Sequence, residues 1–458
     1  MRDPRRIGIV GWGIEGQSAY RYFGPEHEYL VVNEEPRDDF PVESASVEIQ
    51  YLSHKRPAGM VGTAKDLSYL KGIDSCDKII YQPSAYRNLQ TAFGDDSHFW
   101  SKATTTLHIF FEEVKTKNII GVTGTKGKGT TSTLIARLLE SEGKKVYLGG
   151  NIGKSPLDFV KDVDADDWVV LELTNFQLYN FPYSPHIALS LIIAPEHMDW
   201  HSDMNEYVEA KANIFRHQKA DDIAVYFAKN EYSKKIAQYS PGQKIPYFEA
   251  PGAYIRDDGM IVVGPEQIEV MPKSEVKLLG EHNLQNVCAA LTAVFEALGA
   301  LDKAKAVLSS FSGLEHRQEF VRDLEDVKYY DDSFAAAPGA TMAALETISG
   351  PKIAIIGGFD RQLSLKNLAL AVQGHSDDIS KILLIGASAQ RTAKELDEAG
   401  FSNYEILAGK TMPEIVSRAH DLAKAGDSVI LSPGFPSFDM FKNFTERGLK
   451  FKEAVHKL

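Results

Sequence analysis

The chain has 458 residues, and its 63 acidic side chains outnumber its 50 Lys and Arg side chains, which gives a formal net charge of −13. An acidic chain is a poor candidate for holding duplex DNA or an anionic membrane by general electrostatics, so we expect neither a nucleic-acid partner nor a membrane partner. Two cysteines, Cys76 and Cys288, are too few for a disulfide scaffold and lack metal-site spacing. We therefore expect inert thiols in a reducing cytosol.

The N-terminal arginines at positions 2, 5 and 6 precede a short apolar run and a glycine turn. This order is unlike the apolar core and cleavage site of a signal peptide. No apolar run approaches the roughly 20 residues that a membrane-spanning helix needs. We therefore expect a cytoplasmic protein, and we expect it to be a monomer.

Short runs rich in Ile and Val recur along the chain, and each is followed by a helical pattern. They lie at residues 7–10, 119–122, 169–173, 187–193, 353–356, 382–385 and 429–431. Continuous apolar strands that alternate with helices predict an α/β fold built on largely parallel sheets. Three such units, with boundaries near residues 115 and 313, predict domains at 1–115, 116–313 and 314–458. Residues 247–272 are predicted to be an excursion of short strands and turns.

The first glycine turn has the pattern G-x-G-x-x-G at Gly11, Gly13 and Gly16, directly after an apolar strand. Glycines at this spacing let a backbone approach a pyrophosphate at a helix N-terminus. Glu34 follows about twenty residues later, at the place of a ribose contact. The pattern alone leaves open NAD, another diphosphate or no ligand.

A second glycine-rich turn, at residues 121–131, also joins a strand to a helix. Its amides would hold phosphates, Lys128 would reach the β- and γ-phosphates, and a hydroxyl would bind Mg²⁺. Val122 replaces the first glycine of the usual pattern and Gly129 replaces its Ser or Thr, so the nearest hydroxyl belongs to Thr130. The turn predicts nucleoside-triphosphate binding by Gly124, Thr125, Lys126, Gly127, Lys128, Gly129, Thr130 and Thr131.

Two polar clusters follow apolar strands. Glu172 ends one strand, and a carboxylate in that position is costly unless it is paired or bound to a metal. The strand at 187–193 leads to a second cluster that contains His197 and His201. No H-E-x-x-H pattern supports zinc. Oxygen-bound Mg²⁺ fits better beside a phosphate loop; the alternative is a solvated polar turn.

A lysine occupies the apolar face of a helix predicted over residues 205–217. Lys211 lies four residues after Tyr207 and three before Ile214, so it shares their stripe. A lysine in that position must be paired, lowered in pKa or chemically modified. A side chain that extends along the surface to reach water is the alternative.

Taken in order, these residues resemble the Mur ligases of peptidoglycan synthesis, along essentially the whole chain. The resemblance rests on residues 123–130, 149–153, 172–178, 194–199, 280–286, 315–317, 332–333, 357–358, 432–433 and 437–444. It implies an N-terminal Rossmann-like domain for a UDP moiety, a central ATPase and a C-terminal Rossmann-like domain for an amino acid. The branch it implies uses ATP to join glutamate to UDP-N-acetylmuramoyl-L-alanine through an acyl phosphate.

The resemblance also implies residue roles. Catalysis would depend on Lys128, His197 and Lys211, the last carbamylated by CO₂. The ligands of Mg²⁺, or of Mn²⁺ in its place, would be Thr130, Glu172, His197 and Lys211. Further ATP contacts would be Asn283, Arg317 and Asp332. The UDP substrate would contact Gly13, Ile14, Glu34, Asn151, Thr174 and Gln177. Glutamate would contact Arg361, Ser437, Phe438 and Phe444.

The chain departs from the family pattern after Asp332 and Ser333. The family usually continues with Lys-Ala-Thr, whereas this chain has Phe334, Ala335 and Ala336. A cation and a hydroxyl that would face glutamate are thus missing, so we expect D-glutamate and keep L-glutamate open. Gly129 is a feature of folylpolyglutamate synthases, which are the second enzyme hypothesis. The third hypothesis is of another class: a pseudo-ligase that binds nucleotide and acts as an interaction partner.

Overall fold

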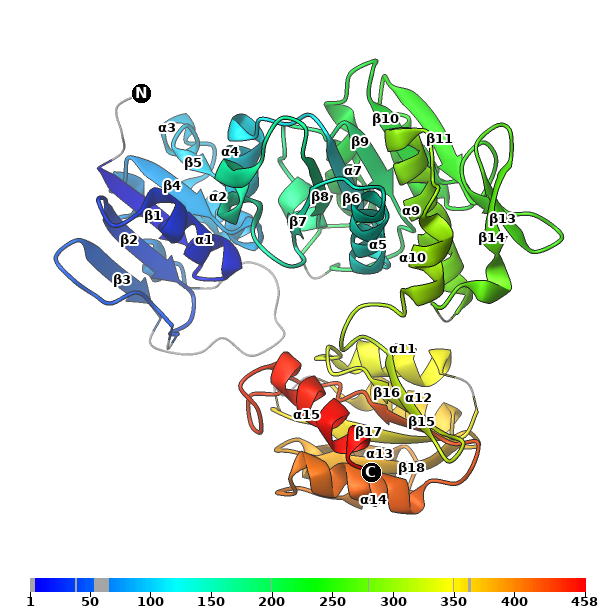
Figure 1. Cartoon of the computed structure of the whole chain (residues 1–458). Coiled ribbons are helices and arrows are strands. Elements are labelled where there is room, and N and C mark those ends of the chain that lie inside the picture. The colour runs from blue at the N-terminus through cyan, green and yellow to red at the C-terminus, as the bar shows by residue number, and fades with distance from the viewer. Residues whose placement is uncertain are drawn as a thin grey trace. The chain divides into compact units, whose positions relative to one another are not determined.

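The structure is a computed structural model that describes residues 5–37, 39–52, 66–198, 200–278, 280–348, 350–360 and 364–458. The chain divides into two compact units, one ending at Phe311 and the other spanning Ser312–Leu458. Figure 1 colours the first from blue to green and the second from yellow to red. Parallel sheets covered by helices in both units confirm the predicted α/β class.

The first unit begins with a parallel sheet in the order β3-β2-β1-β4-β5. Its strands are β1 (Arg6–Val10), β2 (Glu28–Asn33), β3 (Val47–Tyr51), β4 (Lys78–Tyr81) and β5 (Ala103–Thr104). Ile7 and Ile9 pack with α1 (Ile14–Phe23) and α4 (Thr106–Glu113). Val10 faces the opposite core, with α2 (Tyr86–Phe93) and α3 (Ser97–Trp100). Both faces of the sheet are therefore buried, as a continuous apolar strand requires.

A second parallel sheet in the same unit has the order β11-β10-β9-β6-β8-β7. Its strands are β6 (Ile119–Thr123), β7 (Val146–Gly150), β8 (Trp168–Glu172), β9 (Ile187–Ser190), β10 (Ile223–Phe227) and β11 (Gln243–Tyr247). On one face α5 (Lys128–Ser141) and α9 (Glu281–Leu298) pack side by side, with α10 (Ala304–Ser310) next to them (Figure 1). The other face is covered by α6 (Asn175–Leu178), α7 (Met204–Arg216) and α8 (Glu231–Ala237).

One predicted strand was too long. The apolar run at 187–193 forms β9 only as far as Ser190. The following residues leave the sheet, because the carbonyl of Ile192 accepts a hydrogen bond of 2.7 Å from the amide of Thr125. The excursion predicted at 247–272 is confirmed as a small antiparallel sheet. Its strands are β12 (Tyr254–Ile255), β13 (Met260–Val263) and β14 (Ile268–Pro272).

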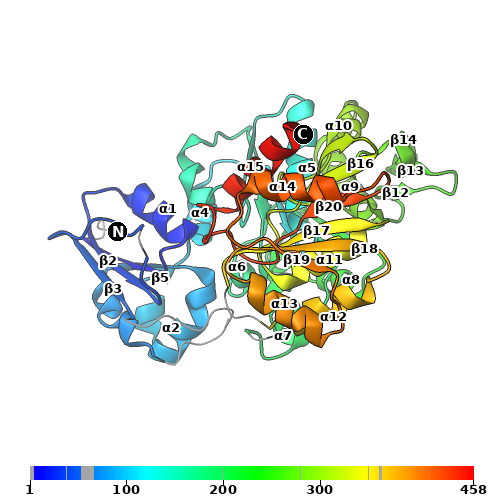
Figure 2. The ribbon, with the colours of Figure 1, turned by 90° about the horizontal axis from the view of Figure 1, so that it is seen from below.

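The second unit holds a sheet in the order β15-β16-β20-β17-β18-β19, in which only β15 runs antiparallel to its neighbour. The strands are β15 (Glu319–Leu324), β16 (Val327–Asp331), β17 (Lys352–Gly357), β18 (Ile379–Ile385), β19 (Tyr404–Ile406) and β20 (Ser428–Leu431). Alternate residues of β17 face opposite cores. Figure 2 shows α14 (Met412–Leu422) and α15 (Phe444–His456) on one side of this sheet, and α12 (Lys366–Gly374) and α13 (Ala389–Glu398) on the other. A further helix is α11 (Pro338–Thr347).

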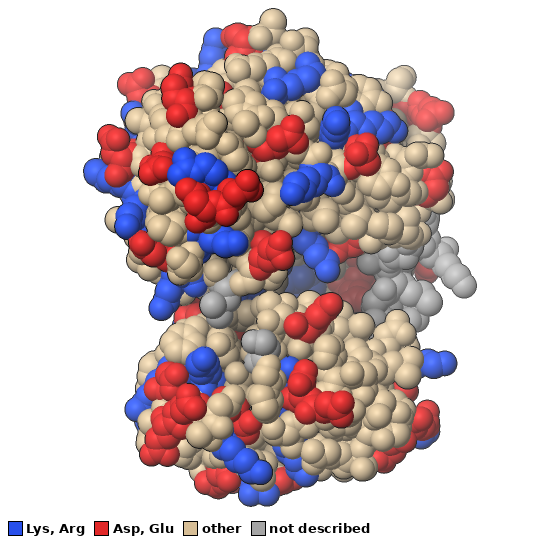
Figure 3. Space-filling view, turned by 90° about the vertical axis from the view of Figure 1, so that its right-hand side faces the viewer, with Lys and Arg blue, Asp and Glu red and all other residues tan. Residues whose placement is uncertain are grey.

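Cys76 and Cys288 are both buried and unpaired, as expected of inert thiols. Burial raises the pKa of Cys76 to about 11 and that of Cys288 to about 12. On the face shown in Figure 3, basic and acidic side chains are interspersed over both units. No helix in the described part of the chain is long and apolar enough to cross a membrane.

Candidate functional site

The second sheet brings three polar segments to one edge. β6 lies between β8 and β9, and all three strands are parallel, so the segments that follow them start from the same edge. These segments are the phosphate loop after β6, Glu172 at the end of β8 and the 191–197 loop after β9. The phosphate loop, Glu172 and His197 therefore lie in segments at a common edge of the sheet.

The phosphate loop is fixed by tight backbone contacts. Gly127 has φ 88°, and a Cβ there would lie 2.3 Å from Oδ1 of Asn286. The hydroxyl of Thr125 donates to the carbonyl of Ala194 at 3.0 Å and accepts from the Ala194 amide at 2.9 Å. Helix α5 begins directly after the loop, with Thr130 and Thr131 buried in its first turn. The loop thus presents a preformed helix N-terminus, the usual geometry for a bound phosphate.

Two lysine side chains converge on this loop. Nζ of Lys128 donates to the carbonyls of Gly124 and Thr125, each at 2.9 Å. Nζ of Lys211, on α7, donates to the same Gly124 carbonyl at 2.9 Å. Lys211 is only 1% exposed, which excludes the alternative of a side chain that reaches water. Burial, and next the charge of Lys128, lower the pKa of Lys211 well below its usual value, which favours the neutral amine.

Glu172 is a buried carboxylate at the end of β8, with 5% exposure. Nδ2 of Asn151 donates to its Oε1 at 2.7 Å, and the Asn151 amide donates to the Glu172 carbonyl at 2.9 Å. Gly150, which precedes Asn151, has φ 99°, and a Cβ there would lie 2.2 Å from that carbonyl. The close approach of the two strand ends therefore requires glycine, and it directs the Asn151 amide at the carboxylate.

The two histidines of the second polar cluster lie in different environments. His197 has φ 57°, its side chain is 35% exposed, and its ring centroid lies 4.9 Å from that of Phe176. His201 is buried, with Nε2 2.8 Å from Nδ2 of Asn175, and burial lowers its pKa to about 4. His197 is therefore the histidine that is open to a ligand, whereas His201 packs inside the fold. Asp199, between them, lies outside the described residues.

The residues predicted to hold a metal are rich in oxygen donors. Within the described residues, the only three His, Cys, Asp or Glu side chains with ligand atoms close enough to share an ion are His316, Glu319 and Asp331, in the second unit. A zinc-type cluster around His197 is therefore absent from the described part of the chain. Mg²⁺ bound through Thr130, Glu172, His197 and a carbamate on Lys211 remains a prediction, and the neutral Lys211 amine is the form that can react with CO₂.

The first glycine turn is as tightly built as the second. A Cβ on Gly16 would lie 2.0 Å from the carbonyl oxygen of Gly11. Gly13 is the residue that precedes α1, and Ile14 is 63% exposed. The Trp12 amide donates to Oδ1 of Asn33 at 2.9 Å, which ties the turn to the end of β2 just before Glu34. A hollow of about 550 Å³ lies beside this edge, lined by Phe40, Glu43, Ile49, Gln50, Tyr51, Ser68 and Tyr69.

Glu15, inside this turn, was missed by the sequence analysis. Its Oε1 accepts a hydrogen bond of 2.9 Å from Nε2 of Gln177, on α6. Oε1 of Gln177 in turn accepts from the amide of Thr174 at 3.0 Å and from its hydroxyl at 3.1 Å, in a capping box. Burial raises the pKa of Glu15 to about 7. The signal in the sequence that could have identified Glu15 is a carboxylate inside a turn that is otherwise suited to an anion.

The C-terminal unit has its own polar edge, after β16 and β20. Asp332 is 4% exposed, and its carboxylate accepts from the Ser432 hydroxyl at 2.6 Å and from the Gln318 amide at 3.1 Å. Burial raises the pKa of Asp332 to about 7. The guanidinium of Arg317 lies 5.9 Å from the ring centroid of Phe334, which is 51% exposed. Arg317 and Asp332 thus come from neighbouring segments of one edge.

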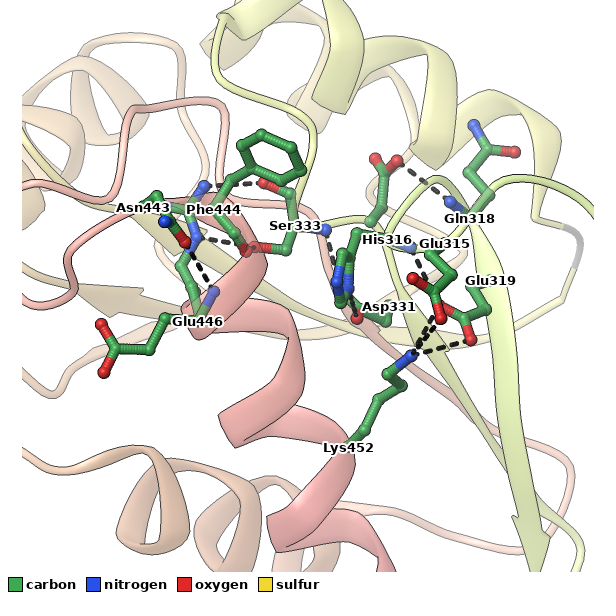
Figure 4. Close-up of polar contacts among 12 residues, drawn as sticks. Glu315, His316, Gln318, Glu319, Asp331, Ser333, Asn443, Phe444, Glu446 and Lys452 are labelled. Carbon is green, nitrogen blue, oxygen red and sulfur yellow. Dashed lines mark hydrogen bonds and ion pairs between the residues drawn. The ribbon is translucent and has the colours of Figure 1, made fainter. Parts of the chain in front are cut away.

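Figure 4 shows how this edge is held together. Nδ1 of His316 lies 2.6 Å from Oδ2 of Asp331, and the His316 amide donates to Glu319 at 2.8 Å. Nζ of Lys452 donates to Glu319 at 3.0 Å. The carboxylates of this metal-like group are therefore already bonded by a lysine and by backbone amides. We infer that His316, Glu319 and Asp331 stabilise this edge of the sheet and do not bind an ion.

The described residues among the predicted amino-acid contacts differ in exposure. Ser437 is only 2% exposed, whereas Phe438 is 63% and Phe444 38% exposed. The ring of Phe444 packs edge-on against Phe334, with centroids 5.2 Å apart. Arg361 lies outside the described residues. Among the described contacts, the rings of Phe438 and Phe444 are therefore the ones accessible to a ligand.

Arg447, on α15, is a second residue that the sequence analysis missed. Its side chain is fully buried and donates to the Ser333 hydroxyl at 3.0 Å, the Ser333 carbonyl at 2.8 Å and the Phe435 carbonyl at 3.0 Å. A Cβ on the next residue, Gly448, would lie 2.1 Å from Nδ1 of His316. The signal in the sequence is the same as at Lys211: Arg447 is a cation on the apolar stripe of a helix.

Two family models match the chain. Residues 122–294 match the Mur ligase middle domain, and residues 316–435 match the Mur ligase glutamate ligase domain. A UDP-N-acetylmuramoylalanine--D-glutamate ligase of Clostridium kluyveri is 33% identical over 463 residues, covering 99% of this chain and 96% of the relative. One of the same name from Clostridium perfringens is 36% identical over 347 residues, 74% of each chain.

Solved structures share the fold at lower identity. UDP-N-acetylmuramate-alanine ligase MurC from Thermotoga maritima has a TM-score of 0.57 and 17% identity, covering 99% of both chains. MurF ligase from Thermotoga maritima, in complex with ADP, has a TM-score of 0.55 and 16% identity, covering 98% of this chain and 95% of that one. With relatives above 30% identity along nearly its whole length, this chain belongs to the Mur ligase family.

Proposed function

We propose that this protein is an ATP-dependent ligase that joins D-glutamate to UDP-N-acetylmuramoyl-L-alanine, a step of peptidoglycan precursor synthesis. The observation that carries the proposal is the similarity, along 99% of the chain, to a relative named for that reaction. The preformed phosphate loop and the buried lysine beside it supply the chemical parts that such a ligase needs.

ATP is proposed to bind with its phosphates on the loop from Gly124 to Lys128. Nζ of Lys128 bonds to two loop carbonyls, and its side chain is long enough to reach phosphates held on the loop. Thr131 bonds to Asn286, which bonds to Asn283, so a polar chain leads from α5 to the other proposed contact in this unit. The remaining proposed contacts in the loop and in the second unit are Thr125, Lys126, Gly127, Gly129, Thr130, Arg317 and Asp332.

A neutral Lys211 amine is suited to carbamylation. Its nitrogen attacks CO₂, a nitrogen–carbon bond forms and one proton leaves, which converts a buried amine into a carboxylate. Thr130, Glu172, His197 and this carbamate would hold Mg²⁺ or Mn²⁺, which when bound neutralises charge on the phosphoryl oxygens. The Asn151 amide keeps the Glu172 carboxylate oriented at the edge of the sheet.

The UDP substrate is proposed to lie along the first sheet's edge at Gly13, Ile14 and Glu34, and to reach Asn151, Thr174 and Gln177. Its alanyl carboxylate attacks the γ-phosphate in line, which releases ADP and forms an acyl phosphate. The amine of glutamate then attacks the acyl carbon, and phosphate leaves. The protein's contribution is to position these groups and to stabilise charge.

Glutamate is proposed to contact Arg361, Ser437, Phe438 and Phe444. The three domains at 1–115, 116–313 and 314–458, the cytoplasmic location and the monomeric state are part of the same proposal. L-glutamate is a second candidate, because Phe334 and Ala336 stand where the family has Lys and Thr. Without that cation and hydroxyl, fewer donors fix the orientation about the glutamate Cα.

The test is a ligation assay with ATP, Mg²⁺ and UDP-N-acetylmuramoyl-L-alanine, run separately with pure D-glutamate and pure L-glutamate and read by product mass. We expect product with D-glutamate. Product with L-glutamate alone would reverse the stereochemical part. Incorporation of only a neutral or basic amino acid would overturn the dicarboxylate assignment, and no ATP consumption under any condition would favour the pseudo-ligase.

A further inference from the structure

Glu15 connects two parts of the first unit that are 162 residues apart in sequence. It lies in the first turn of α1, between Gly13 and Gly16 of the glycine turn, and its Oε1 accepts from Nε2 of Gln177 on α6. Its other oxygen, Oε2, is buried. The buried hydroxyl of Thr106, on α4, lies beside the carboxyl group as a donor, and it lowers the pKa of Glu15 against the larger effect of burial.

Contacts at both ends fix the direction of the Gln177 amide. Oε1 of Gln177 accepts from the Thr174 N–H, and Nε2 donates to Glu15. Exchanging the oxygen and the nitrogen would place two N–H donors against each other at Thr174. An amide nitrogen carries two hydrogens, and Glu15 accepts one of them. The second N–H is therefore held in a fixed direction, and among the described residues it has no acceptor other than a ligand.

The charge of Glu15 matters because of where it lies. The glycine turn and the N-terminus of α1 form an arrangement that attracts an anion. An ionised carboxylate in that turn opposes the binding of an anion, whereas a protonated one does not. A neutral carboxyl group also suits the burial of Oε2, which no cation of the described residues accompanies.

We propose that protonated Glu15 is a positioning residue that aims Gln177 at the UDP-linked substrate, and that its ionisation weakens binding of that substrate. The inference rests on the proposed function, because it takes the substrate to be a uridine diphosphate conjugate. Burial raises the pKa of Glu15 to about 7, so the two forms exchange near neutral pH. Affinity for the diphosphate is therefore highest at low pH and falls as the pH rises through about 7.

Other titratable groups on the elements around α1 do not account for such a change. Burial raises the pKa of Tyr81, on β4, to about 12 and lowers that of His108, on α4, to about 4. Both therefore stay neutral around pH 7. Lys78, on β4, has its Nζ 5.6 Å from the ring centroid of Phe23. Other charged groups on these elements are in pairs or hydrogen bonds: Arg21 with Asp158, Arg6 with Glu48, Glu113 with Tyr22 and Glu112 with Tyr183.

The experiment measures the KM for UDP-N-acetylmuramoyl-L-alanine from about pH 6 to pH 8 in four proteins: wild type, Glu15→Gln, Glu15→Ala and Glu26→Gln. The KM of the wild type should rise about ten-fold across this range, the limit for loss of one proton with a pKa near 7. Glu15→Gln keeps the acceptor for Gln177 without a charge, so its KM should stay low and flat. Glu15→Ala should have a raised KM at every pH. Glu26→Gln, an exposed acid beyond the end of α1, should follow the wild type.

Thermal unfolding of each variant shows whether it is folded, and direct calorimetric binding of the same substrate without ATP separates the two proposals. No binding to the wild type at any pH would overturn the proposed function. Binding that weakens equally with pH in wild type and Glu15→Gln would overturn the role of Glu15 alone. A wild-type KM in Glu15→Ala would have the same meaning.

Discussion

The two glycine turns of the first unit both join a strand to a helix but differ in their side-chain chemistry. Each joins a buried parallel strand to a helix, and in each a Cβ on one glycine would collide with a neighbour, at Gly16 with a backbone carbonyl and at Gly127 with Asn286. The first turn contains Glu15, whereas the second is approached by Lys128 and Lys211. The backbone supplies amides in both, and the side chains decide what charge each can accept.

The difference explains why the glycine pattern alone left NAD, another diphosphate or no ligand open at the first turn. A turn with the Lys128 cation beside it is suited to the concentrated charge of a triphosphate. A turn that contains a carboxylate with a pKa near 7 is suited to a less charged ligand. Replacements in the two turns should therefore have separable effects.

The largest effect is expected from Lys211→Ala. It removes the buried amine on the second turn, and we expect ligation to fall by about a thousand-fold, the scale of losing a preorganised electrostatic partner. Lys211→Arg should remain inactive, because a guanidinium does not form the carbamate. Excess acetate or chloride should restore part of the activity of Lys211→Ala. Lys234→Ala, an exposed lysine on α8, is the matched control, and near-normal turnover in Lys211→Ala would refute the assignment.

Lys128→Ala should reduce ATP-dependent turnover by about a hundred-fold, because the loop loses the cation that reaches the phosphates. Binding of the UDP substrate, measured by calorimetry, should be unchanged, since the first turn is untouched. The control is Lys144→Ala, an exposed lysine past the far end of α5. Equal loss of ATP and UDP-substrate binding would mean that the two turns do not act separately.

Gly16→Ala changes the first turn and leaves the second turn intact. The added methyl would meet the Gly11 carbonyl at 2.0 Å, so we expect a loss of about 2 kcal/mol in the free energy of unfolding and a several-fold weaker affinity for the UDP substrate. ADP binding should be retained. Gly374→Ala, in α12 with open space around it, should leave the affinity unchanged and should not lower the free energy of unfolding. An unaltered UDP-substrate affinity in Gly16→Ala would disconnect this turn from the substrate.

The smallest effect is expected from Thr130→Val. Its hydroxyl, one residue after Gly129, is the nearest substitute for the missing Ser or Thr of the phosphate loop. Its loss should raise the Mg²⁺ concentration needed for half-maximal activity by a few-fold while the fold is kept, because Val has almost the same shape. An unchanged Mg²⁺ titration would show that the metal is held by other groups.

The sequence predicted the parts of the fold and site that have local causes. Buried parallel strands are continuously apolar, so β1, β6, β8 and β17 were found. The antiparallel strand β15 was not, because its residues are only half buried and carry no such run. Lys211 was found because a charge on an apolar stripe is a local contradiction.

What the sequence did not show depends on distant partners. Glu15 acquires its significance from Gln177, 162 residues away, and the end of β9 is set by a bond to the phosphate loop. Ser437 was predicted as a contact, yet its burial depends on how the loop after β20 folds back. Long-range contacts of this kind leave no periodic pattern in the chain.

The position of Arg447 has a consequence for the order in which the protein is made. Its guanidinium supplies hydrogen bonds to a serine that leaves the ribosome 114 residues earlier. Until α15 has been synthesised, the loop at Ser333 has water in place of those donors. The loop that follows the Asp331–Asp332 pair therefore reaches its final hydrogen bonding late in translation, after the strands of the first unit have all emerged.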